Sequence, residues 1–74
     1  MSQSGLENAM KTLRAEAGLT QAELALQVGV TRKTINTVEN GVFIPSALLA
    51  LKIARALGQP VENVFWFQDG SDNG

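Results

Sequence analysis

Hydrophobic residues recur along the chain at helical spacing, in segments that glycine or proline separates. The first apolar stripe advances in steps of four, three and four residues, at Leu6, Met10, Leu13 and Ala17. Residues 4–7, Ser-Gly-Leu-Glu, have the Ser-x-x-Glu form of a capping box, which marks the start of a helix. We therefore predict a first helix that begins at Ser4 and ends near Ala17, where Gly18 offers a left-handed stop.

Two short helices are predicted to follow in quick succession. Residues 20–23, Thr-Gln-Ala-Glu, form a second capping box, and Gly29 ends the helix that it opens. Thr31 is an N-cap candidate for the next helix, which ends at the Asn40-Gly41 pair. Both helices have an apolar inward face, which consists of Leu24, Ala25 and Val28 in the first and of Ile35 and Val38 in the second.

A fourth helix is predicted in the most apolar part of the chain. Pro45 disfavours helix at the residue before it, so residues 42–45 form a connector. Ser46 then caps residues 47–57, and Gly58 closes the helix. Because this segment is so rich in apolar residues, we expect it to be the central, buried helix.

The chain ends with a short fifth element and a polar tail. Pro60 is suited to the start of a turn or helix over residues 61–67. Residues 68–74 hold no apolar side chain that could dock, and we expect them to be disordered. The pattern as a whole predicts an all-α fold, a compact five-helix bundle in one domain over residues 4–67.

Composition excludes several classes of function. The 74 residues include no cysteine and no histidine, which removes disulfides, thiolate metal sites and the commonest metal ligand and general base. A chain this short builds no deep cleft, so we expect no enzyme activity, no metal and no cofactor. The chain shows neither a signal-peptide pattern nor an apolar stretch of about 18 residues, so we predict a cytoplasmic protein without membrane contact.

Net charge restricts how the chain could meet nucleic acid. The formal charge is −1 and the pI about 5.1, which argues against indiscriminate binding to a polyanion. Residues 1–41 balance their charges, with Lys11, Arg14, Arg32 and Lys33 against Glu7, Glu16, Glu23 and Glu39. A surface that binds DNA must therefore come from local clustering of basic residues.

Residues 21–40 show the spacing of a helix-turn-helix. Ala25 is small where the helices cross, and Gly29 suits the turn. The outward face of the second helix is polar and almost free of acid, with Arg32, Lys33, Asn36 and Thr37. Arginine and lysine donate to guanine, asparagine pairs with adenine, and a threonine methyl group contacts the thymine methyl group. The alternative is an ordinary helical hairpin, in which glutamate would be more common on that face.

The segment GLTQAELALQVGVTRKTINTVENG, with LR before it and PSALLALKIARAL after it, resembles the repressor/Cro-type (xenobiotic response element) helix-turn-helix family. The resemblance covers about residues 6–67. It implies a transcriptional regulator, such as a repressor, whose third helix, about residues 32–40, enters the major groove of double-stranded DNA. It also implies a homodimer on a pseudo-palindromic operator. No residues remain for an effector domain, so we expect no small-molecule effector.

Family roles transfer to this sequence position by position. The resemblance implies that base contacts come from Gln21, Arg32, Lys33, Asn36 and Thr37. It implies phosphate contacts from Thr31 and Asn40. Structural alternatives stay open for three of these residues: Thr31 only caps the third helix, Asn40 only terminates it, or Gln21 is only solvated.

Two features of the sequence bear on partners. Three adjacent aromatic residues, 65–67, cannot all enter one small core. We expect Phe65 in the core. The resemblance suggests that side chains of this last element form a dimer contact, which we assign to Val64, Trp66 and Phe67. Related sequences commonly carry charged residues where this chain has Ala9, Ala17, Leu26 and Val42. The alternative function is therefore a protein-interaction module of the same fold with weak or lost DNA binding.

Overall fold

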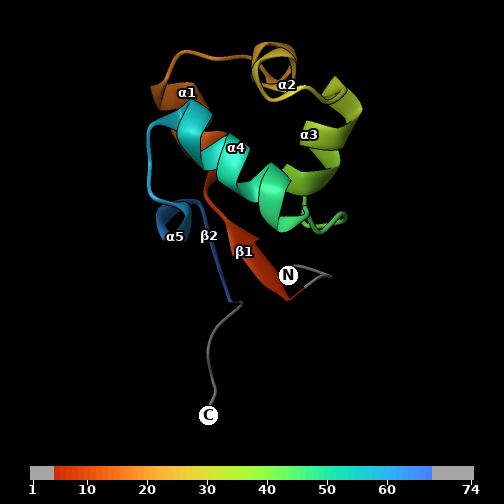
Figure 1. The fold of residues 1–74 in the computed structure, drawn as a ribbon, viewed down its shortest axis with the longest axis vertical. Helices are drawn as coiled ribbons and strands as arrows, with labels where there is room; N and C mark the ends of the chain where they lie inside the picture. Colours follow the sequence, from red (N-terminus) through yellow and green to blue (C-terminus); the bar gives the residue numbers. More distant parts are fainter. Residues whose placement is uncertain (1–4, 68–74) are drawn as a thin grey trace.

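The computed structural model describes residues 5–67, which form five helices and one small antiparallel sheet (Figure 1). The helices are α1 (Met10–Glu16), α2 (Gln21–Val28), α3 (Arg32–Glu39), α4 (Ala47–Leu57) and α5 (Val61–Val64). The strands are β1 (Leu6–Asn8) and β2 (Phe65–Phe67). The predicted compact helical fold with a helix-turn-helix is confirmed, and the sheet is an addition to it. Ser4 and the tail over residues 68–74 lie outside the described residues.

The predicted start of the first helix is wrong. Leu6–Asn8 is a strand that pairs with β2, with Leu6 opposite Phe67 and Asn8 opposite Phe65. Helix α1 begins only at Met10, whose N–H donates to Oδ1 of Asn8 at 3.0 Å. The Ser-x-x-Glu pattern was misleading because a strand partner from the far end of the chain satisfies this backbone instead.

The fifth helix, α5, is shorter than predicted, and its last residue, Val64, is in the core. Helix α5 ends at Val64, and the aromatic residues that follow are extended. The carbonyl of Val64 accepts a hydrogen bond from the N–H of Ala9 at 2.9 Å, which holds the two ends of the domain together. The predicted place of Val64 at a dimer contact is wrong, because this side chain is fully buried.

Side-chain caps define the starts of α2, α3 and α4, as the sequence predicts. In the capping box of α2, Glu23 N–H donates to Thr20 Oγ1 at 3.0 Å, and Thr20 N–H donates to Glu23 Oε1 at 2.9 Å. Thr31 and Ser46 accept from the N–H three residues onward in the same way. These local interactions fix where each helix begins.

The core lies where α1, α2, α3 and α4 meet, closed below by α5 and the sheet. Its largest fully buried side chains are Met10, Leu24, Ile35, Val38, Ile53 and Val64. Helix α4, which the sequence predicts to be the central, buried helix, is buried on one face only. It buries Ile53, Ala54 and Leu57, whereas Leu48 and Leu51 are more than half exposed on its other face.

Candidate nucleic-acid interface

Helices α2 and α3 are joined by a tight turn at Gly29, as in a helix-turn-helix. Gly29 has a φ of 79°, a left-handed backbone conformation that residues with a side chain rarely adopt. Its N–H donates to the carbonyl of Ala25 at 2.9 Å. Ile35 and Val38 anchor α3 to the core, since both are almost completely buried. The opposite face of α3 is therefore turned to solvent at one side of the domain (Figure 1).

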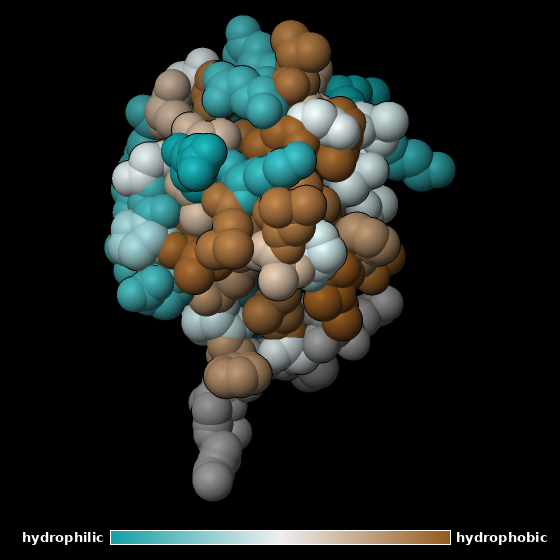
Figure 2. Space-filling model, in the orientation of Figure 1, coloured by the Kyte–Doolittle hydropathy of each residue, from teal (hydrophilic) through white to brown (hydrophobic). Residues whose placement is uncertain are grey.

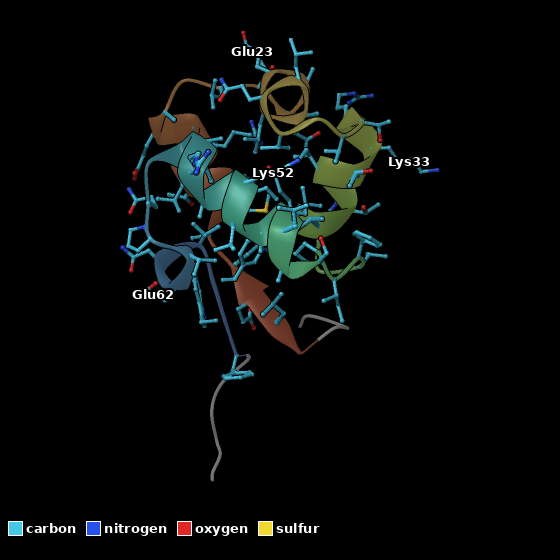
Figure 3. The ribbon with its side chains drawn as sticks, in the orientation of Figure 1. Glu23, Lys33, Lys52 and Glu62 are labelled. Atoms are coloured by element: carbon cyan, nitrogen blue, oxygen red, sulfur yellow. The ribbon has the colours of Figure 1, made fainter. Side chains whose placement is uncertain are left out.

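The predicted base-contacting residues of α3 share this outward face. Arg32, Lys33 and Asn36 are exposed, and Thr37 is half-buried beside them. Lys33 extends away from the rest of the domain (Figure 3). Glu39, the one acidic residue of α3, is turned inward, with 4% of its side chain exposed. The outward face of α3 thus carries two positive charges and no carboxylate, although the whole chain has a net charge of −1.

Thr31 and Asn40 take the structural roles that the sequence left open. Thr31 Oγ1 accepts the N–H of Thr34 at 3.2 Å as the N-cap of α3. Asn40 is the C-cap residue of α3, and its Nδ2 donates to Oδ1 of Asn36 at 3.3 Å. Both residues are also exposed, one at each end of the outward face of α3. Their structural roles therefore leave both side chains beside the surface that would meet DNA.

Gln21 makes a contact that the sequence analysis did not consider. Its Nε2 donates to Oε1 of Glu39 at 3.1 Å, so the first residue of α2 is bonded to the last residue of α3. This contact uses one of the two amide protons of Gln21 and links the start of α2 to the end of α3.

Sequence reasoning also missed the ion pair that joins α1 to α3. Arg14 Nε lies 2.7 Å from Oε2 of Glu39, and Arg14 Nη2 lies 3.3 Å from Oε1. Arg14 Nη1 donates to the carbonyl of Leu19 at 2.9 Å. Helical spacing carried a signal for it, since Glu39 lies four residues after the buried Ile35 and Arg14 four residues after the buried Met10.

A surface hollow of about 520 Å³ lies between the start of α2 and the start of α3. Its lining includes Arg14, Thr20, Gln21 and Arg32. The outward face of α3 therefore continues toward the N-terminus of α2, where backbone N–H groups favour negative charge.

The described residues, 5–67, show neither a metal-binding group nor a membrane-spanning helix. No three histidine, cysteine, aspartate or glutamate residues in this range lie together as a metal-binding group. Within the same range, no helix has the length and apolarity needed to cross a membrane.

Comparison with known proteins agrees with this geometry. A helix-turn-helix family model matches residues 10–63. The HTH-type transcriptional regulator YgzD of Bacillus subtilis is 45% identical over 64 residues, which cover 86% of this chain and 97% of that protein. A regulator of the same description from Methanothermobacter thermautotrophicus is 54% identical over 61 residues, covering 76% and 88% of the two chains.

A solved structure shows the same fold. The restriction-modification controller protein C.AhdI from Aeromonas hydrophila is 33% identical, with a TM-score of 0.69 over 73% of this chain and 82% of that chain. The residues that the family model matches, 10–63, include the helix-turn-helix that places Arg32, Lys33 and Asn36 on an exposed face. The chain therefore belongs to the XRE/Cro-type family of helix-turn-helix transcriptional regulators, which are DNA-binding proteins rather than enzymes.

Proposed function

We propose that the protein regulates transcription by binding a specific double-stranded DNA sequence, with α3 in the major groove. One observation carries the proposal: α3 is pinned by Ile35 and Val38 and turns a cationic, carboxylate-free face to solvent. A helix of this width fits the major groove, where each base pair has its own pattern of donors and acceptors. Rigid anchoring supports readout, because a base contact needs a fixed side-chain origin.

Each residue of this face has a chemistry that suits DNA. Arg32 and Lys33 would donate to guanine O6 and N7, and Asn36 would pair with adenine. Thr37 would make an apolar contact with a base. Gln21, at the start of α2, would donate its second amide proton to a base. Thr31 and Asn40, at the two ends of α3, would contact phosphates, which position a protein without specifying sequence.

We also propose that the protein acts as a homodimer on a pseudo-palindromic operator. One α3 reads only a few base pairs, and a two-fold pair would place two copies about 34 Å apart on successive faces of the major groove. Trp66 and Phe67, at 44% and 85% exposure, lie on β2 and are candidates for the contact between copies. Leu48 and Leu51 of α4 are also exposed, and Figure 2 shows apolar area over the part of the domain where α4 lies in Figure 1.

Selection from a random pool of duplex DNA, followed by a salt titration, tests the proposal. We expect one enriched sequence with two related halves. The logarithm of the binding constant for this sequence should fall linearly with the logarithm of the salt concentration, because binding releases counterions from the DNA. Failure to enrich any sequence, together with no binding to random DNA at low salt, would contradict the proposal.

A second function has one observation in its favour. Leu26 and Val42 are 84% and 62% exposed, so both add apolar area to the surface of the domain. A module that binds another protein and has lost DNA affinity would use such residues. It would show no salt-dependent DNA binding, so the same titration separates the two functions.

A further inference from the structure

A small cavity lies between α3 and the loop that follows it. It has a volume of about 160 Å³ and is lined by Lys33, Thr34, Thr37 and Phe43. Phe43 is not among the residues that the family resemblance identifies, yet its ring stands beside two of the proposed base-contacting side chains. The volume is well below the roughly 300–1,000 Å³ of pockets that hold small molecules, so it suits only part of a larger partner.

Backbone hydrogen bonds hold Phe43 beside α3. The carbonyl of Thr37 accepts two hydrogen bonds, from the N–H of Val42 at 3.0 Å and from the N–H of Phe43 at 3.2 Å. The loop is thereby tethered to the last turns of α3. The cavity is part of the folded domain rather than a chance approach of a free loop.

The threonine hydroxyl groups around the cavity already have partners. Thr37 Oγ1 donates to the carbonyl of Thr34 at 2.9 Å, and Thr34 Oγ1 and Thr31 Oγ1 lie within hydrogen-bond distance, 3.0 Å apart. Because its proton is used within α3, the Thr37 hydroxyl is a poor donor to a base. The exposed lining of the cavity is mainly apolar, as expected for threonine methyl groups, the aliphatic stem of Lys33 and the ring of Phe43.

From this lining we infer that the cavity receives the 5-methyl group of a pyrimidine in the major groove, and that Phe43 and Thr37 together recognise it. The inference rests on the proposed function and adds a specificity-determining residue to it. Among the four DNA bases only thymine presents a methyl group in the major groove, and threonine methyl and phenylalanine side chains contact it. The ammonium group of Lys33, beyond its stem, remains available to a neighbouring base.

Thymine and 5-methylcytosine carry the same methyl group, and substitution in the selected operator distinguishes them. Each thymine is replaced in turn by deoxyuridine, which lacks only that methyl group. We expect one thymine in each half-site whose replacement weakens binding by about fourfold, the value for burying one methyl-sized group. In a second series, cytosine and 5-methylcytosine occupy that position. A gain from methylation of cytosine shows that the cavity accepts the methyl group from either base, and no gain restricts the site to thymine.

Variants of the protein connect this effect to the cavity. Phe43→Ala removes the ring, and Thr37→Ser removes the methyl group while keeping the hydroxyl. Both should bring the thymine-to-deoxyuridine affinity ratio close to one, with circular dichroism unchanged. Val42→Ala, in the same loop but not in the cavity lining, is the matched control and should keep the ratio of the unaltered protein.

Two results would overturn the inference while leaving the proposed function intact. The first is an operator that binds tightly and in which no thymine is sensitive to deoxyuridine. The second is a Phe43→Ala protein that keeps the full ratio. Absence of any selected operator, together with no binding to random DNA at low salt, is a different result, because it refutes the proposed function and the inference together.

Discussion

The guanidinium group of Arg14 in α1 and the carboxylate of Glu39 in α3 form an ion pair with 2.7 Å between Nε and Oε2. Only 14% and 4% of the two side chains are exposed. The same carboxylate accepts the amide of Gln21, so α1, α2 and α3 meet at one residue. The position of the proposed DNA-reading helix therefore depends on a contact remote from its outward face.

Replacement of Glu39 by alanine should destabilise the domain strongly. The change leaves the Arg14 guanidinium in a largely buried place without its counter-charge, which costs about 3–5 kcal/mol in comparable pairs. Chemical denaturation measures the free energy of unfolding. Glu16→Ala, an exposed carboxylate of α1, is the control and should change it by less than about 0.5 kcal/mol. Equal effects of the two substitutions would show that the ion pair does not contribute to the free energy of unfolding.

Caps and core residues should differ in their contributions to stability. Thr20→Ala removes the capping hydroxyl of α2 and should cost about 1 kcal/mol. Ile35→Ala leaves a cavity beneath α3 and should cost about 2–5 kcal/mol, enough to threaten folding of so small a domain. Denaturation of the two variants under the same conditions ranks them. The reverse order would contradict the buried position of Ile35.

Substitution of Arg32 by alanine should weaken binding to the selected operator by about 1–3 kcal/mol and relax its preference at one base pair. The physical reason is the loss of a bidentate guanine contact from an exposed side chain. Fluorescence anisotropy with the operator and with random duplex DNA measures both effects. An equal loss on both DNAs would instead make Arg32 a phosphate contact.

Trp66→Ala should convert the proposed homodimer to a monomer in analytical ultracentrifugation and sharply reduce operator binding. The indole is the largest exposed aromatic group on β2, and interface energy concentrates in such anchors. Helical circular dichroism should be largely unchanged, because Trp66 is outside the core. Ile44→Ala is the control for loss of an exposed apolar side chain elsewhere and should leave the proposed dimer intact.

Two outcomes would contradict this role of Trp66. If the variant stays dimeric, the contact lies elsewhere, and Leu48 and Leu51 on α4 become the next residues to substitute, followed by Leu26 and Val42. If it unfolds, the indole supports the domain rather than a second copy.

The sequence alone determined α2, α3 and α4, and with them the helix-turn-helix. Thr20, Thr31 and Ser46 each cap a backbone N–H three residues away, and Gly29 ends α2 through its own conformation. Ile35 and Val38 face inward because of helical spacing. These determinants act within one or two turns of chain, so they can be read without knowledge of the fold.

Only the tertiary structure decided the features that join distant segments. Residues 6–8 became a strand, against a local capping signal, because residues 65–67 lie beside them and complete their backbone hydrogen bonds. Val64 entered the core because the short turn of α5 aims it inward, and Glu39 found Arg14 and Gln21 because three helices converge there. Phe43 reached the edge of α3 because two N–H groups of its loop share the carbonyl of Thr37. Such contacts depend on which distant segments meet when the helices pack. The spacing of residues along the chain does not give that information.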